Sequence, residues 1–182
     1  MNRFINNNRT DKNTIHSYIP LYETLFSPKK ETAKHILEIG ILGGGSIDLW
    51  NTYFTNATIY GVDIMPSHAV WGGITNKQNI ILYTATDAYD FEFVDTLRDI
   101  KFDIIIDDGP HSLFSQQQFI KLYSPLLADD GILVIEDIQA IDWVDTLRQS
   151  VPYHLQKYIK VYDLRDKKGR YDDIVFTIDK NN

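Results

Sequence analysis

The stretch HILEIGILGGGSIDLW, residues 35–50, joins a short apolar run to a cluster of glycines and then to a segment with helical spacing. Unbroken apolar runs of this length are typical of strands that are covered on both faces of a parallel sheet. Glycines at the end of such a strand allow positive φ angles and let a ligand approach the backbone closely. The stretch therefore predicts a strand, a ligand-binding loop and a helix, and a tight turn without a ligand is the alternative.

Other apolar runs follow the first one at intervals that leave room for helical crossovers. They occupy residues 57–64, 79–85, 102–107 and 131–137. Segments with apolar residues at roughly helical spacing lie between them. Near the end of the chain, two strand-like segments flank the polar stretch RDKKGR, residues 165–170, which predicts a hairpin.

These elements predict an α/β fold with a Rossmann-like, mostly parallel, doubly wound sheet and an antiparallel C-terminal hairpin. We expect a single domain over residues 1–182, with an N-terminal helical segment at 1–30 and the Rossmann-like core at 35–182. The N-terminal helix is expected within TIHSYIPLYETLFS, residues 14–27, and to start or break around Pro20.

Composition excludes several classes of site and partner. The chain has no cysteine, so disulfides, thiolate metal sites and cysteine nucleophiles are excluded. A formal net charge of -7 argues against nucleic acid as the main ligand. The apolar runs are too short to cross a bilayer, and the first residues lack the core of a signal peptide. We therefore expect no membrane association and a cytoplasmic location, in the host cytoplasm if the source is viral.

Two acids at later strand ends extend the ligand-binding prediction. Asp63 follows the second apolar run, about 20 residues after the glycines, where a carboxylate can accept both ribose hydroxyls of an adenosine. Asp87 follows the third run and can accept a hydrogen bond from the exocyclic amine of an adenine. Each acid is also suited to cap a helix, and that reading stays open.

Glu38 distinguishes between two cofactors that carry an adenosine. Rossmann dehydrogenases seat a pyrophosphate at the glycine loop, where negative charge is favourable. An acid just before that loop repels a pyrophosphate but suits the ammonium and sulfonium groups of S-adenosylmethionine. The sequence therefore favours S-adenosylmethionine over NAD.

The stretch IIIDDGPH, residues 104–111, and the stretch IED, residues 135–137, add four acids and a histidine. In an open parallel sheet the carboxyl ends of the strands share one crevice, so these side chains are expected to converge. Hard oxygen ligands without cysteine point to magnesium, with manganese or calcium as substitutes. A solvated turn, with His111 at a helix N-terminus, is the alternative.

Six stretches, in order along nearly the whole chain, give the sequence its resemblance. They are TDKNTIHSYIPLYE, LEIGILGGGSIDLW, IYGVDI, IIIDDGPH, GILVIEDIQ and GRYDDI. The sequence resembles the class I methyltransferases grouped with macrocin and mycinamicin sugar O-methyltransferases and with proteins labelled cephalosporin hydroxylase. It departs from their pattern at Pro110, where the family's usual loop has serine.

The resemblance implies roles for individual residues. Asp108, Glu136 and Asp137 would ligate Mg2+ or Mn2+, His111 would be the catalytic base, and Asp107 would face S-adenosylmethionine or support the loop. The acceptor would be a sugar or glycan hydroxyl in glycan or secondary-metabolite biosynthesis. The expected cofactor-binding residues are Glu38, Gly40, Gly43, Gly44, Ser46, Asp63, Ile64, Asp87 and Asp107.

Other functions and roles stay open at this point. A catechol-type O-methyltransferase shares the metal and the cofactor, an NAD-linked oxidoreductase shares the fold, and a non-catalytic binding subunit needs neither activity. Residues 11–18 either close over the cofactor or acceptor, or cap the N-terminal helix through Asn13 or Thr14. Aromatic residues near the N-terminus permit a homo-oligomer, a dimer or higher, without requiring one.

Overall fold

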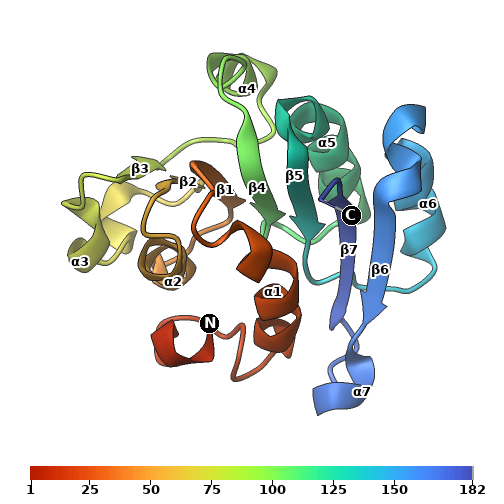
Figure 1. The fold of residues 1–182 in the computed structure, drawn as a ribbon, viewed down its shortest axis with the longest axis horizontal. Coiled ribbons are helices and arrows are strands. Elements are labelled where there is room, and N and C mark those ends of the chain that lie inside the picture. Colours follow the sequence, from red (N-terminus) through yellow and green to blue (C-terminus); the bar gives the residue numbers. More distant parts are fainter. Residues whose placement is uncertain (182) are drawn as a thin grey trace.

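The computed structural model describes residues 1–181, and a seven-stranded sheet runs through it (Figure 1). The strand order is β3-β2-β1-β4-β5-β7-β6. The first five strands pair in parallel, and β7 is antiparallel to both β5 and β6. The strands are β1 (His35–Ile39), β2 (Thr58–Val62), β3 (Ile80–Tyr83), β4 (Phe102–Asp107), β5 (Leu127–Ile135), β6 (Ile159–Asp163) and β7 (Ile174–Asp179). Residue 182, the last of the predicted domain, lies outside the described residues.

Helices cover both faces of the sheet. The helices are α1 (Tyr18–Phe26), α2 (Gly45–Tyr53), α3 (Gly72–Thr75), α4 (Phe91–Thr96), α5 (Leu113–Tyr123), α6 (Trp143–Ser150) and α7 (Arg165–Lys168). One apolar layer joins the sheet to α1, α2 and α3, and a second layer joins it to α4, α5 and α6. The predicted doubly wound sheet with an antiparallel hairpin is confirmed.

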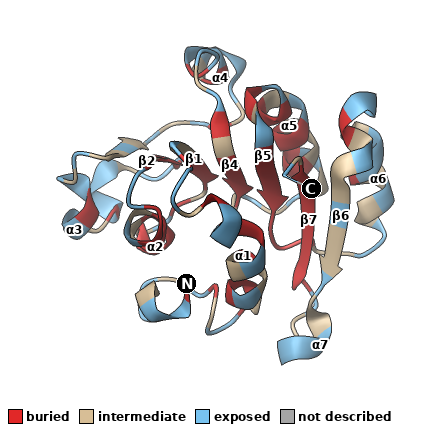
Figure 2. Ribbon diagram, viewed as in Figure 1, coloured by how far each residue is buried: buried red, intermediate tan, exposed pale blue. Residues whose placement is uncertain are grey.

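The strand sequences explain why there are two layers. Side chains alternate between the faces of a strand, so Ile104 and Ile106 of β4 pack in the layer of α1 while Ile105 packs in the layer of α5. All three are fully buried, and red marks the whole centre of the sheet in Figure 2. A strand covered on both faces needs apolar residues at consecutive positions, which is the pattern of the three isoleucines in FDIIID.

The N-terminal helix is shorter than the sequence indicated. Helix α1 begins at Tyr18, so Pro20 lies in its first turn, where a missing backbone N–H leaves no hydrogen bond unmade. Residues 12–15 form turns, and the backbone N–H groups of residues 14–16 converge on the carbonyl of Asp11. Among residues 1–181, no helix is long and apolar enough to cross a membrane.

Candidate functional site

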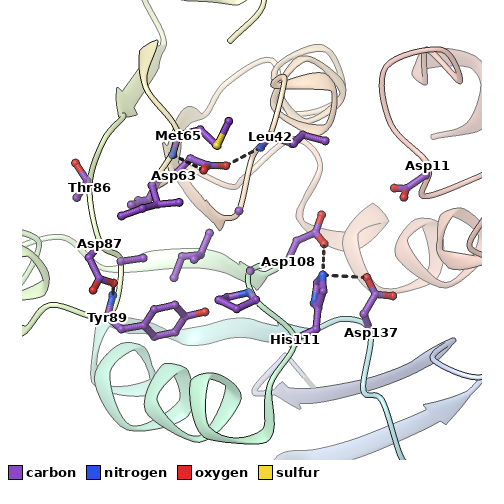
Figure 3. A pocket seen from close by; sticks show the side chains of 17 residues that line it. Asp11, Leu42, Asp63, Met65, Thr86, Asp87, Tyr89, Asp108, His111 and Asp137 are labelled. Carbon is purple, nitrogen blue, oxygen red and sulfur yellow. Dashed lines mark hydrogen bonds and ion pairs between the residues drawn. The ribbon is translucent and has the colours of Figure 1, made fainter. Parts of the chain in front are cut away.

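A cavity of about 760 Å³ opens at the carboxyl ends of the parallel strands (Figure 3). It lies where the strand order reverses between β1 and β4, the usual position of a ligand in an open α/β sheet. Ile39 of β1 pairs in register with Asp107 of β4, which brings the glycine loop beside the DDGPH loop. The lining residues are Asp11, Ile39, Gly40, Leu42, Val62, Asp63, Ile64, Met65, Thr86, Asp87, Ala88, Tyr89, Asp108, Gly109, Pro110, His111 and Asp137.

Gly40 allows the two loops to touch. Its φ is +80°, and a Cβ atom at this position would lie 2.0 Å from the carbonyl oxygen of Asp108. Asp63 fixes the same loop, because its Oδ2 accepts hydrogen bonds from the backbone N–H groups of Ile41 and Leu42 at 2.8 and 2.7 Å. The glycine loop is therefore held between an acid of β2 and the backbone after β4.

One end of the cavity carries two acids and a histidine. His111 Nε2 lies 3.7 Å from Asp108 Oδ1 and 3.5 Å from Asp137 Oδ2, so the imidazole stands between the two carboxylates (Figure 3). One ligand atom from each residue lies within 4.8 Å of the other two. Burial, followed by the charge of Asp108, raises the pKa of Asp137. The two carboxylates can hold a divalent cation beside the imidazole.

Lys12 brings a positive charge to the inner side of this acidic group. Its ammonium lies 2.6 Å from Glu136 Oε2, 2.7 Å from Asp108 Oδ2 and 3.3 Å from Glu38 Oε1. Only 1% of Lys12 is exposed. Burial lowers the pKa of Lys12, but the carboxylates of Asp108, Glu136 and Glu38 outweigh it and raise that pKa well above its usual value. The buried acids are therefore neutralised in part by a charge from the N-terminal segment.

Asp107 lies beside the cavity without lining it. The side chain is 2% exposed, and its Oδ1 accepts a hydrogen bond from the hydroxyl of Tyr89 at 2.9 Å. Burial raises the pKa of Asp107 to about 7. Asp107 thus supports Tyr89, which does line the cavity.

The predicted site residues divide into three groups. Seven of them line the main cavity, namely Gly40, Asp63, Ile64, Asp87, Asp108, His111 and Asp137. Ser46 lines a smaller adjoining cavity of about 290 Å³ beneath residues 7–14. The remaining five, Glu38, Gly43, Gly44, Asp107 and Glu136, do not line the main cavity.

Glu38, the expected cofactor-binding acid, and Glu136, the expected metal ligand, lie deeper in the protein than the surface of the main cavity. Glu38 accepts hydrogen bonds from Ser46 Oγ at 2.6 Å and Trp50 Nε1 at 3.1 Å, and it is fully buried. Glu136 accepts a hydrogen bond from the hydroxyl of Tyr22. The structure thus brings both glutamates to Lys12 and brings His111 together with Asp108 and Asp137.

The N-terminal segment contributes side chains that sequence reasoning left without a role. Tyr18 donates a hydrogen bond to Asp137 Oδ1, and His16 Nδ1 lies 3.2 Å from the same oxygen and 2.7 Å from Asp173 Oδ1. Lys12, His16 and Tyr18 are buried behind the acids, so they do not close over the cavity. Their placement within TDKNTIHSYIPLYE was the available signal, because it put a lysine, a histidine and tyrosines beside an apolar helix start.

Within residues 1–181, four residues other than glycine adopt left-handed backbone conformations. Leu42, Ala85, His111 and Asp137 have φ values of 46°, 52°, 55° and 52°. Each follows a parallel strand, and three of the four line the cavity. Conformations of this kind are rare for side chains with a Cβ atom and concentrate at functional sites.

Comparisons with known proteins agree with this geometry. No protein-family profile matches the chain. The 8-demethyl-8-alpha-L-rhamnosyl tetracenomycin-C 2'-O-methyltransferase of Streptomyces olivaceus is 33% identical over 144 residues, which is 74% of this chain and 36% of the relative. The mycinamicin VI 2''-O-methyltransferase of Micromonospora griseorubida is 34% identical over 140 residues, 71% of this chain and 33% of the relative.

The chain belongs to the macrocin and mycinamicin O-methyltransferase family. It spans about a third of the length of the curated family members that it matches. The solved structure of the MycE methyltransferase from the mycinamycin pathway, in complex with Mg, SAH and mycinamycin VI, has the same fold with a TM-score of 0.71. That alignment covers 93% of this chain and 50% of MycE at 24% identity. The structure therefore adopts the class I methyltransferase fold that this family uses.

Proposed function

We propose that the protein transfers a methyl group from S-adenosylmethionine to a sugar hydroxyl with the help of a divalent cation. The observation that carries the proposal is one cavity with two chemically different ends. Asp63 and Asp87 lie at one end, and Asp108, His111 and Asp137 lie at the other (Figure 3). The names of the curated relatives and the Mg and SAH in the MycE structures support it.

The end formed by Asp63 and Asp87 suits an adenosine. Ile39, Val62 and Ala88 give the cavity an apolar wall for a purine. Asp63 Oδ2 already accepts two backbone hydrogen bonds, but Oδ1 accepts only one, from Met65, and keeps a second lone pair for a ribose hydroxyl. The smaller cavity beside the glycine loop, lined by Ser46 among others, suits the amino-acid part of the cofactor.

The acidic end fits a hard divalent cation. Asp108 Oδ1 and Asp137 Oδ2 face the cavity with His111 between them, and carboxylate oxygens are the ligands that Mg2+ and Mn2+ prefer. When bound there, the cation would supply the charge that lowers the pKa of an acceptor hydroxyl. Glu136 would contribute to this end through its charge, since Lys12 and Tyr22 bind its two oxygens.

The side chains of the chain would then perform the transfer as follows. The cavity orients the acceptor oxygen toward the methyl group, opposite the departing sulfur. An O–CH3 bond forms as the S–CH3 bond breaks, and the electron pair of the broken bond stays on sulfur as S-adenosylhomocysteine. His111 Nε2 takes the proton of the acceptor hydroxyl as general base.

The test is methyl transfer to a panel of free, nucleotide-linked and glycan-linked deoxyhexoses, with a catechol included. We expect His111→Ala to lower kcat by 10²-fold or more, as removal of a general base does. His154→Ala is the matched control, because His154 is exposed and lines neither cavity. Full activity of His111→Ala would contradict the role of His111 as general base.

A second measurement isolates the metal. We expect excess chelator to abolish transfer and added Mn2+ to restore it. Asp137→Asn should weaken Mn2+ binding, whereas the fully exposed Asp129→Asn should not. Undiminished methyl transfer in chelator would refute the requirement for a metal. Transfer to the catechol alone would refute a sugar as the acceptor. The cytoplasmic location, the homo-oligomer and the single domain stay predictions.

A further inference from the structure

Residues 12–22, here called the donor segment, contact every acid at the metal end of the cavity. Lys12 reaches Asp108, Glu136 and Glu38, Tyr18 reaches Asp137, and Tyr22 reaches Glu136. The segment lies far from these acids in the sequence, but it packs beside the carboxyl ends of β4 and β5. Its polar groups therefore form a layer behind the carboxylates.

The contacts divide the oxygens of each carboxylate in a consistent way. Oδ2 of Asp108 accepts a hydrogen bond from Lys12, whereas Oδ1 faces His111. Oδ1 of Asp137 accepts a hydrogen bond from Tyr18, whereas Oδ2 faces His111. Glu136 differs, because Tyr22 and Lys12 bind both of its oxygens. Two carboxylates thus present one oxygen each to the cavity, and the third presents none.

The ammonium of Lys12 has the contacts that a bound cation would have. Three carboxylates from three strand ends surround it within 3.3 Å, and the lysine side chain is 2% exposed. Two buried carboxylates, Glu38 and Glu136, beside the partly exposed Asp108 would be strongly unfavourable without a cation, since the buried ones lose the hydration that water provides. A tethered charge meets this requirement permanently and needs no ion from solution.

We propose that Lys12 is a positioning residue of the metal site, a built-in cation that fills the inner end of the acidic group and directs Asp108 Oδ1 to the cavity. This inference rests on the proposed function, because it concerns the same metal end. Its consequence is that one divalent ion binds, at the outer end. A second ion is excluded because the ammonium already occupies the position between Glu38, Asp108 and Glu136.

The experiment counts Mn2+ ions bound to the purified full chain by electron paramagnetic resonance and calorimetry. We expect one ion on the wild type and two on Lys12→Met, which keeps most of the length of the side chain but removes its charge. Lys29→Met is the matched control, since Lys29 is equally buried and pairs with the exposed Asp130 at 2.8 Å away from the cavity. This control should bind one ion with unchanged affinity.

A double variant covers the case in which Lys12→Met does not fold. Lys12→Met with Glu136→Gln removes one acid together with the ammonium, so the net charge of the group stays the same. We expect it to bind one Mn2+ ion about 10- to 100-fold more weakly, the usual cost of removing a group that orients a metal ligand.

The outcomes separate this inference from the proposed function. One ion on Lys12→Met, or an unchanged affinity of the double variant, would overturn the role of Lys12 and leave the metal site in place. Two ions on the wild type would also overturn it, because the inner end would then be open. No Mn2+ on the wild type would instead refute the proposed metal-assisted function, and the role of Lys12 with it.

Discussion

Gly40→Ala tests whether the contact between the two loops determines the site. The added Cβ atom would lie 2.0 Å from the Asp108 carbonyl oxygen, and real Cβ atoms essentially never come within 3.0 Å, so the DDGPH loop would have to move by at least 1.0 Å. A left-handed φ costs a residue with a side chain about 1–2 kcal/mol. The movement also weakens the hydrogen bond from Asp108 N to Ile39 O, now 2.8 Å, which is worth about 1 kcal/mol. We expect a loss of about 2–3 kcal/mol in the free energy of unfolding.

Urea unfolding followed by tryptophan fluorescence measures this loss. Gly43→Ala is the matched control, because a Cβ atom there meets nothing within 4 Å and should change stability by less than about 0.5 kcal/mol. The displacement of Asp108 should also weaken Mn2+ binding in Gly40→Ala but not in Gly43→Ala. If Gly40→Ala stays within about 0.5 kcal/mol of the wild type, the close approach of the two loops does not exist as described.

Three further changes test other parts of the site. Tyr22→Phe leaves a buried oxygen of Glu136 without its donor and should cost about 1–3 kcal/mol in urea unfolding, whereas a cost near zero would argue against that contact. Lys168→Met removes the donor to the carbonyls of residues 14 and 16, at 3.2 and 2.8 Å, so limited proteolysis should cut the first 16 residues several-fold faster than in the wild type. In chelator, the raised pKa of Asp107 means that the folded protein holds a proton that the unfolded chain releases above about pH 3.9. The contribution of Asp107 to stability should therefore fall as pH rises to about 7, by up to about 4 kcal/mol, and Asp107→Asn should remove that contribution; equal pH profiles of the two proteins would contradict it.

The sequence predicted the fold well because the apolar runs are unusually clear. The centre of FDIIID is three consecutive isoleucines, 104–106, so both faces of the strand are apolar there, which is the pattern of a doubly covered strand. The antiparallel end followed from the polar, glycine-containing stretch between β6 and β7. The start of α1 was less predictable, because residues 12–15 form turns held by Asp11 and by Lys168, which lies 152 residues from His16 in the sequence.

The candidate site was predictable only as far as strand ends determine it. Parallel strands bring Asp63, Asp108 and Asp137 to one edge whatever their side chains do, so their convergence needed no structure. The direction of each carboxylate depends on its partner, and Lys12 comes from a segment whose path no periodicity specifies. Glu38 and Glu136 were therefore expected in the cavity, whereas the structure shows them bound to Lys12 beneath it.

The left-handed residues at the strand ends imply a conflict between two kinds of selection. Glycine or asparagine would relieve about 1 kcal/mol of backbone strain at such positions. A library randomised at Leu42, Ala85, His111 and Asp137 and selected for heat resistance alone should therefore drift toward these two residues at all four positions. Selection for turnover should retain His111 and Asp137 and allow substitution of Leu42 and Ala85. A comparison of the variants recovered from the two selections would therefore distinguish backbone strain that serves catalysis from strain that only shapes a loop.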